Sequence, residues 1–353
     1  MRTRLRHCAL LLLAALILAG PAFGKDLVCS VCHQRITGKY LTAANGRVFC
    51  SQACYETTLP KCAKCGRTIS GKFYDYEGKK YCSEECLSVL WPSCALCGKK
   101  TQAWSEIEGQ KFCKACAAKP RCAECGLPFE KGVELPDKRA LCAACQPRVL
   151  SEPEAVATLA AEARAALLKL TGEQTDIVPE LKLAMLPELM ALTDTKIVQG
   201  PIRSQLRGFF HRQETVRTGG EPEDKPDHEL AKTVYLLNYM LPENVLVTAV
   251  HEETHDLMLD HYPATRQAPA WVQEGLAQFA AAQVARGRHF TRQLQAIEKS
   301  PDPAYGDGYR FFRDTFGADD WPAVAKWLRA TDLSALPANP PAAPAATPAD
   351  PGK

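Results

Sequence analysis

After its first 24 residues the sequence contains no apolar run as long as a transmembrane helix requires. It also contains no cysteine after Cys145, although 16 of its 17 cysteines lie between Cys29 and Cys145. With 46% hydrophobic and 24% charged residues in a chain of 353, it is neither a disordered tail nor a polytopic membrane protein. The uneven use of cysteine predicts two different units, one held by sulfur chemistry and one by an apolar core.

Charge divides the chain in the same way. Residues 25–148 carry 20 Lys and Arg against 12 Asp and Glu, which is a net charge of +8. Residues 149–353 carry 20 against 28, which is a net charge of −8. Exposed lysines on small domains usually serve solubility, so we predict no nucleic-acid partner for the basic half.

The first 24 residues are typical of an export signal. Three arginines precede an apolar stretch over 8–19, and Ala22 and Gly24 stand at the −3 and −1 positions of a cleavage before Lys25. Twelve helical residues rise about 18 Å, which is too short for a bilayer core of roughly 30 Å. We therefore expect an exported protein, periplasmic or secreted, with no stable membrane anchor after cleavage of 1–24. An uncleaved anchor is the alternative.

The sixteen cysteines form four copies of one pattern over residues 25–148. Each copy is C-x2-C, a spacer of 15 to 17 residues, and then C-x2-C or C-x3-C. A glycine follows the second cysteine in three copies, as in a zinc knuckle. Four thiolates at this spacing suit tetrahedral zinc. The copies, at 29–54, 62–86, 94–116 and 122–145, predict four structural zinc sites with the ligands Cys29, Cys32, Cys50 and Cys54; Cys62, Cys65, Cys82 and Cys86; Cys94, Cys97, Cys113 and Cys116; and Cys122, Cys125, Cys142 and Cys145.

Two other interpretations of these cysteines stay open. Eight disulfides would suit an oxidising compartment, but disulfide-rich domains seldom place every cysteine in a close pair. Dithiol redox catalysis also uses C-x-x-C, but it is expected within a βαβ pattern that this half of the sequence does not show. His33, directly after Cys32, is a further candidate ligand, although a solvent-facing histidine is the simpler interpretation.

The second half begins with a predicted helix. Ser151 is a candidate N-cap, and the alanine- and leucine-rich segment that follows should end near Leu170 at Gly172. Extended segments are expected over 180–186 and 233–240. A charged loop over 219–227 lies between them.

Residues 245–260, VLVTAVHEETHDLMLD, contain no Pro or Gly and have helical apolar periodicity. On a helix His251 and His255 project from one face and can bind one metal ion, while Glu252 can reach a metal-bound water. Glu274 follows His255 after eighteen residues, in a second predicted helix that starts after Pro269. Three such ligands leave a coordination position open, as catalytic zinc requires. HExxH-x18-E with W-x-x-E-G-x-A is the gluzincin signature and resembles that of the aminopeptidase-N family.

The chemistry expected of this site is peptide-bond hydrolysis. Zinc would lower the pKa of its bound water toward about 7, and Glu252 would take the proton and pass it to the leaving amine. Tyr305 and Tyr309, in the segment DPAYGDGYRFF, are the candidate donors to the oxyanion. Asp256 and Asp260 are candidates for a carboxylate that orients a zinc-binding histidine.

The paired knuckles of the cysteine modules resemble LIM domains. Together with the segments HEETH, QEGLAQ and YGDGYR, they resemble the DA-one family of LIM-containing peptidases, which regulate growth in plants. The resemblance covers roughly residues 29–330. It departs from the family in its linkers of seven, seven and five residues, in the cysteines that replace the usual LIM histidine, and in the extra finger modules. No ubiquitin-interacting segment is recognisable upstream.

The resemblance implies that His251, His255 and Glu274 are the ligands of a catalytic zinc and that Glu252 is the catalytic glutamate. It favours Tyr305 as oxyanion donor, because Tyr309 stands where the family commonly has Phe. It also implies that the LIM-like modules bind protein partners.

We therefore predict an α+β protein with three parts. They are an array of treble-clef or LIM-like zinc modules over 25–148, a gluzincin-like metallopeptidase domain over 149–333, and a disordered Pro- and Ala-rich tail over 334–353. The predicted activity is that of an exported zinc endopeptidase with one catalytic and about four structural zinc ions, acting on peptides or proteins. The alternative is a non-catalytic zinc-finger scaffold with a degenerate peptidase domain, which the intact Glu252 disfavours.

Overall fold

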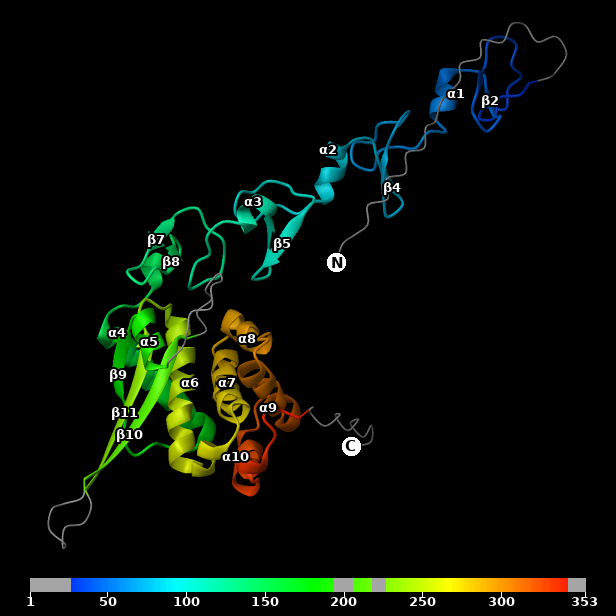
Figure 1. Cartoon of the computed structure of the whole chain (residues 1–353). Coiled ribbons are helices and arrows are strands. Elements are labelled where there is room, and N and C mark those ends of the chain that lie inside the picture. The colour runs from blue at the N-terminus through cyan, green and yellow to red at the C-terminus, as the bar shows by residue number, and fades with distance from the viewer. Residues whose placement is uncertain (1–26, 194–205, 218–226, 342–353) are drawn as a thin grey trace. The chain divides into compact units, whose positions relative to one another are not determined.

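The computed structural model describes residues 27–193, 206–217 and 227–341, as mixed helix and strand. The expected export signal and most of the charged loop over 219–227 lie outside these residues. Within them, no helix is long and apolar enough to cross a membrane. The chain forms two compact units, Met1–Ala118 and Lys119–Lys353 (Figure 1). The boundary thus falls inside the cysteine array, and the fourth module groups with the second unit rather than ending a separate domain at 148.

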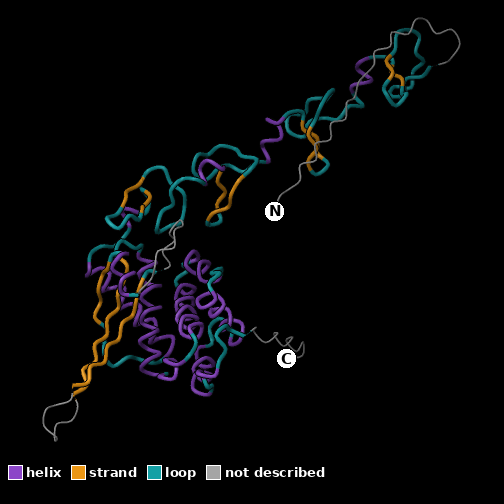
Figure 2. The backbone as a smooth tube through the Cα atoms, viewed as in Figure 1, coloured by secondary structure: helices purple, strands orange, loops and turns teal. Residues whose placement is uncertain are grey.

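Each cysteine module contains an antiparallel two-stranded hairpin and a short helical turn (Figure 2). A second, tighter turn carries the first two cysteines and is closed by one β-bridge, such as Lys61 with Thr68. The elements are β1 (Leu41–Thr42), β2 (Val48–Phe49) and α1 (Gln52–Glu56); β3 (Tyr74–Tyr76), β4 (Lys79–Tyr81), α2 (Glu84–Leu87) and η1 (Ser88–Leu90); β5 (Trp104–Ile107), β6 (Gln110–Cys113) and α3 (Lys114–Ala117); and β7 (Gly132–Glu134), β8 (Ala140–Cys142) and η2 (Gln146–Arg148).

The turn after the second cysteine requires a left-handed backbone in every module. Gly66, Gly98 and Gly126 have φ of 72°, 72° and 68° there, and His33 takes the same place in the first module with φ of 58°. Glycine adopts this conformation without steric cost, which explains its recurrence. His33 is therefore a turn residue, and it is not among the grouped ligands of the first module.

The second unit joins a three-stranded sheet to a layer of helices. The sheet order is β10-β11-β9, with β10 antiparallel and β9 parallel to β11. Helix α6 packs against α4, α7 and β10, and α6 and α7 run side by side (Figure 1). The elements are α4 (Pro153–Thr171), β9 (Glu180–Ala184), α5 (Leu186–Leu192), β10 (Gly208–Arg217), β11 (Asp227–Leu237), α6 (Pro242–His261), η3 (Pro263–Gln267), α7 (Ala270–Gly287), α8 (Thr291–Glu298), η4 (Pro303–Asp307), α9 (Gly308–Phe316), α10 (Trp321–Ala330) and η5 (Leu333–Ala335).

The predicted helices are present, with small differences at their ends. Helix α4 begins one residue later than expected, with Glu152 rather than Ser151 as N-cap, and ends at Gly172 in the left-handed conformation. The strand β10 is absent from the sequence-based expectation. Its sequence, GFFHRQETVR, has no regular alternation of apolar and polar residues, and among the described strands it is an edge strand bonded to β11 alone.

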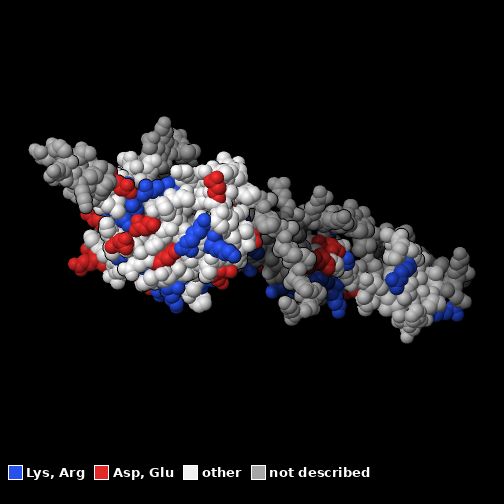
Figure 3. Space-filling model, turned by 90° about the horizontal axis from the view of Figure 1, so that it is seen from below, with Lys and Arg blue, Asp and Glu red and all other residues white. Residues whose placement is uncertain are grey.

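The packed chain also continues past Leu333, where the disordered tail was expected to begin. Leu336 packs against the main core, and Trp271 Nε1 donates a hydrogen bond of 2.9 Å to the carbonyl of Pro337. Residues 334–337 therefore belong to the folded unit, while 342–353 lie outside the described residues. On the face shown in Figure 3, basic and acidic side chains of the described residues are interspersed.

Candidate metal centres

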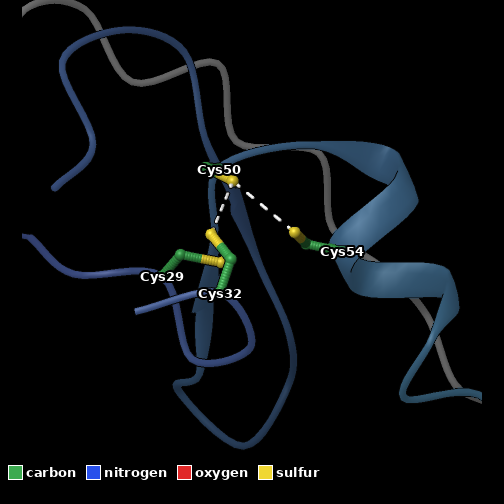
Figure 4. Close-up of side chains that lie close together, drawn as sticks. All are labelled: Cys29, Cys32, Cys50 and Cys54. Atoms are coloured by element: carbon green, nitrogen blue, oxygen red, sulfur yellow. Dashed lines mark hydrogen bonds between the residues drawn. The ribbon is translucent and has the colours of Figure 1, made fainter. Parts of the chain in front are cut away.

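The sixteen cysteines of the array gather into the four expected groups of four. Figure 4 shows the first group, in which Cys50 Sγ lies 3.6 Å from the sulfurs of both Cys32 and Cys54. Neighbouring sulfurs in the other three groups lie 3.6 to 3.9 Å apart. Four sulfurs at about 2.3 Å from one tetrahedral zinc lie about 3.8 Å apart, whereas a disulfide needs about 2.05 Å. No disulfide joins the sixteen cysteines in the structure, and their arrangement fits structural zinc.

In the first group, the sulfurs lie too close together to carry several negative charges without a compensating cation. Backbone amides of Cys32 and Cys50 donate to the sulfur of Cys29 and lower its pKa to about 6. Neighbouring sulfurs of Cys32 and Cys54 raise the pKa of Cys50 to about 12. The cluster thus offers donors to one thiolate but resists holding several negative charges, and a divalent cation removes that repulsion.

A serine fixes the last ligand in two of the modules. Ser51 Oγ accepts a hydrogen bond of 3.3 Å from the amide of Cys54, and Ser83 Oγ accepts one of 3.2 Å from the amide of Cys86. Both serines are N-caps of the short helices that carry these cysteines.

A fifth group of candidate ligands forms where α6 and α7 meet. His251 and His255 lie one turn apart on α6, and Glu274 lies on α7. His251 Nε2 lies 3.3 Å from His255 Nε2 and 3.2 Å from Glu274 Oε2, and His255 Nε2 lies 3.6 Å from the same oxygen. Ligands at about 2.0 to 2.1 Å from one tetrahedral ion lie about 3.4 Å apart, so the three residues fit one shared zinc.

The charges of this group are arranged for a cation. Burial would raise the pKa of Glu274, but hydrogen bonds to His251 and His255 hold it well below its usual range. Burial would lower the pKa of His255, but the hydrogen bond to Glu274 and its charge raise it. Glu274 therefore remains a carboxylate at neutral pH.

Glu252 lies beside this group and is buried where α6 meets the start of β10. Only 6% of the residue is exposed, and burial raises the pKa of its carboxyl group against the opposing charges of the two histidines. The amide of Phe210 donates a hydrogen bond to it. Glycine at position 208 leaves space for the Glu252 side chain, because a Cβ there would lie 2.6 Å from Glu252 Oε1.

Of the two candidate tyrosines, Tyr305 lies at the group and Tyr309 does not. The ring of Tyr305 is stacked on that of His251, with centroids 5.8 Å apart and planes 13° apart. Asp302 fixes the π-helical turn η4 by accepting hydrogen bonds from the amides of Ala304 and Tyr305. Burial and the charges of Glu274 and Glu252 raise the pKa of Tyr305, so it keeps its proton. Tyr309 is a core residue with 1% exposure.

Neither candidate aspartate is bonded to a histidine of the group. Lys232 Nζ, buried on β11, lies 2.8 Å from Asp256 Oδ1 and 2.6 Å from Asp260 Oδ2, and Arg212 also pairs with Asp260. His251 Nδ1 is buried without a hydrogen-bond partner among the described residues. These ion pairs therefore join α6 to the sheet. The sequence did not single out Lys232.

No family model matches the chain, and no curated protein matches it. The resemblance to the DA-one family thus rests on the sequence motifs.

Proposed function

We propose that this protein is a zinc metallopeptidase of the gluzincin type that hydrolyses peptide bonds. The observation that carries the proposal is the convergence of His251, His255 and Glu274, with the buried Glu252 beside them. Two histidines and one carboxylate are the ligand set of catalytic zinc, which keeps a further position for water. The cysteine groups differ from this site because each offers four sulfurs and closes its coordination sphere.

The residues around the candidate site have distinct roles in the proposed reaction. A zinc ion held by the three ligands would supply Lewis acidity and lower the pKa of a coordinated water. Glu252 accepts a proton from the attacking water and transfers it to the leaving amine, and its raised pKa suits this exchange. Tyr305 retains its phenolic proton and donates to the oxyanion that develops on the carbonyl.

Strand β10 supports a peptide as substrate. Among the described strands it pairs only with β11, so one edge has no strand partner. Its residues Gly208 and Phe210 border Glu252. An extended peptide can add to such an edge through backbone hydrogen bonds. Binding along an edge does not require a free amino terminus, which favours endopeptidase action.

The first unit supplies the proposed partner-binding modules. Its exposed apolar side chains include Val89, Leu90 and Trp104, each at least 40% exposed. We propose that these modules bind a protein partner or substrate, and that the protein acts outside the cytoplasm, as residues 1–24 indicate.

The test of the peptidase proposal is Glu252→Gln. We expect the variant to keep its fold and its zinc but to lose at least about 100-fold in cleavage rate, because the general base is missing. Glu243→Gln is the matched control, since Glu243 lies in the first turn of α6 and pairs with the exposed Arg148. An unchanged rate in Glu252→Gln would contradict the mechanism and leave the scaffold alternative.

The metal content of the purified protein tests the ligand assignment. About five zinc ions per chain are expected from four cysteine groups and one His, His, Glu group. A content of about one would show that the cysteines form disulfides in the mature protein.

A further inference from the structure

One residue of the fourth cysteine module connects it to the helix that carries the candidate catalytic residues. Glu124 lies between Cys122 and Cys125, and its side chain is 1% exposed. Glu124 Oε2 accepts hydrogen bonds from the amide of Leu241 at 2.7 Å and from Asn244 Nδ2 at 2.6 Å. The other oxygen, Oε1, accepts one of 2.9 Å from Arg207.

The first two of these contacts hold the start of α6. Leu241 is the N-cap of that helix, and Asn244 is its third residue. In a capping box, a glutamate at the third helical position accepts from the N-cap amide. Here the helix has asparagine at that position, and Glu124 supplies the carboxylate from the cysteine module. Its negative charge also suits the positive end of the helix dipole.

The third contact holds the start of β10. Arg207 precedes Gly208, and its guanidinium also donates to the carbonyl of Ala123, next to Glu124. Gly208 lies against the side chain of Glu252. The same carboxylate therefore anchors the two elements that enclose Glu252. From Asn244 to His251 the helix rises only about 10 Å, at 1.5 Å per residue.

The module is packed into the second unit through further contacts. Leu241 shares an apolar cluster with Cys122, Cys125 and the other two cysteines of the module. Arg292 of α8 donates to the carbonyl of Cys125. Gln293, also of α8, donates to Asn244 Oδ1 at 2.9 Å. The knuckle backbone that presents Glu124 is thus shaped by the cysteines and fitted to three elements of the candidate catalytic unit.

The other modules have no such carboxylate. The residue before the second cysteine is Val31, Lys64 and Leu96 in the first three modules, and Glu124 in the fourth. This residue distinguishes the fourth knuckle in the sequence, and the difference coincides with the grouping of that module with the second unit.

We propose that the fourth cysteine module is a structural part of the candidate peptidase and that Glu124 is a positioning residue for α6 and β10. This positioning role rests on the proposed peptidase function only in treating α6 as the helix that carries catalytic residues. Loss of the carboxylate leaves Arg207, Asn244 and the amide of Leu241 without their buried acceptor, and this loosens the start of α6 and the packing around Glu252.

The experiment compares Glu124→Ala, Glu124→Gln and the matched control Leu96→Ala in the full chain. Amide hydrogen exchange of residues 241–250 is measured together with zinc content and cleavage kinetics. We expect exchange at least about tenfold faster in Glu124→Ala, from the loss of charged hydrogen bonds, and no change in Leu96→Ala. Glu124→Gln retains one acceptor oxygen, so its exchange should lie between wild type and Glu124→Ala. If the wild type cleaves a peptide, Glu124→Ala should lower kcat by a larger factor than it raises KM.

Different outcomes separate this proposal from the peptidase proposal. Unchanged exchange over 241–250 in both variants of Glu124 would overturn the positioning role, whatever the activity. If Glu124→Ala does not fold, Glu124→Gln decides, because wild-type exchange in that variant overturns the proposal. Faster exchange in a protein whose wild type cleaves no peptide would support the positioning role while the proposed peptidase function fails.

Discussion

Gly208 is the residue whose size most directly limits the position of Glu252. A Cβ at this position would lie 2.6 Å from Glu252 Oε1 and 2.8 Å from Thr248 Cγ2. These distances are too short for van der Waals contact, so the carboxylate or the strand must move. The absence of a side chain at this one position thus allows a buried carboxylate to lie against the strand.

Gly208→Ala should lower kcat by about 10- to 100-fold, because a displacement of about 1 Å of a catalytic group has that effect. Zinc content should remain that of the wild type, since no zinc ligand is touched. Gly287→Ala is the control, because a Cβ there meets no atom within 4 Å. Kinetics with a wild-type kcat in Gly208→Ala would show that Glu252 does not need this space.

Tyr262 should make the free energy of unfolding depend on pH in alkaline solution. Its hydroxyl donates a hydrogen bond of 2.9 Å to Glu173, and burial together with that carboxylate raises the pKa of Tyr262 to about 12. Because the folded-state pKa lies above the ordinary value of 10, the contribution to stability is complete below pH 10 and is lost as pH rises toward 12.

Tyr262→Phe should therefore reduce the alkaline loss of stability. The variant is expected to be less stable by about 1 kcal/mol at pH 8, from the lost hydrogen bond. Between pH 10 and 12 the wild type should lose about 2 kcal/mol more than the variant. Denaturant unfolding of both proteins across this range measures the difference, and parallel pH profiles would rule out the role of Tyr262.

At the scale of elements, the four knuckles share one pattern but differ in how they shield their sulfurs. The second cysteine is exposed in the first three modules, at Cys32, Cys65 and Cys97. All four cysteines of the fourth module are buried. The reason is that Leu241 and its neighbours cover the fourth knuckle, whereas the second module, for example, has only a small cluster of its own residues.

We expect this difference to appear in the release of zinc. A thiol reagent in the presence of a chelator should release zinc from the first three modules at least about tenfold faster than from the fourth, because attack there requires local opening. Mass spectrometry of the modified peptides identifies the module that reacts last. Equal modification rates at Cys125 and Cys97 would contradict the expected protection.

Helices α4, α6 and α7 were predicted from the sequence, whereas β10 was not. Helix α6 has a continuous helical periodicity with proline at its first position and no interruption. Strand β10 has a Phe-Phe pair and then seven mostly polar residues, and only its pairing with β11 makes it a strand. Local sequence therefore predicts a helix, whose hydrogen bonds are local, better than an edge strand, whose partner is far along the chain.

At the scale of the whole molecule, the sequence pattern and the packing place the main boundary differently. Composition and charge change after Cys145, but the compact units divide after Ala118. Arg139 shows why, because its guanidinium donates to the carbonyl of Asn238 at 2.7 Å while it pairs with the buried Asp137. The fourth module has the composition of the array but the contacts of the second unit.

Truncation separates these two boundaries. A chain that begins at Lys119 should fold, keep two zinc ions and melt within a few degrees of the second unit in the full protein. A chain that begins at Val149 should lose about 3 to 5 kcal/mol, because Asn244 and the amide of Leu241 lose the charged acceptor of Glu124 and Leu241 loses its apolar cluster. That loss lowers Tm by about 10 °C or more. Equal melting temperatures of the two chains would show that the fourth module is dispensable.

The sequence alone determined the cysteine groups and the pairing of His251 with His255. Ligands of one knuckle, or residues one helical turn apart, lie close together by local geometry whatever the rest of the fold does. The sequence motifs suggested Glu274 and Tyr305, but only the tertiary structure brings Glu274 to the two histidines and stacks Tyr305 on His251. The contact of Glu124 with the start of their helix came from the tertiary structure alone. These contacts join residues far apart in the chain, so they depend on the packing of whole elements, which no local pattern encodes.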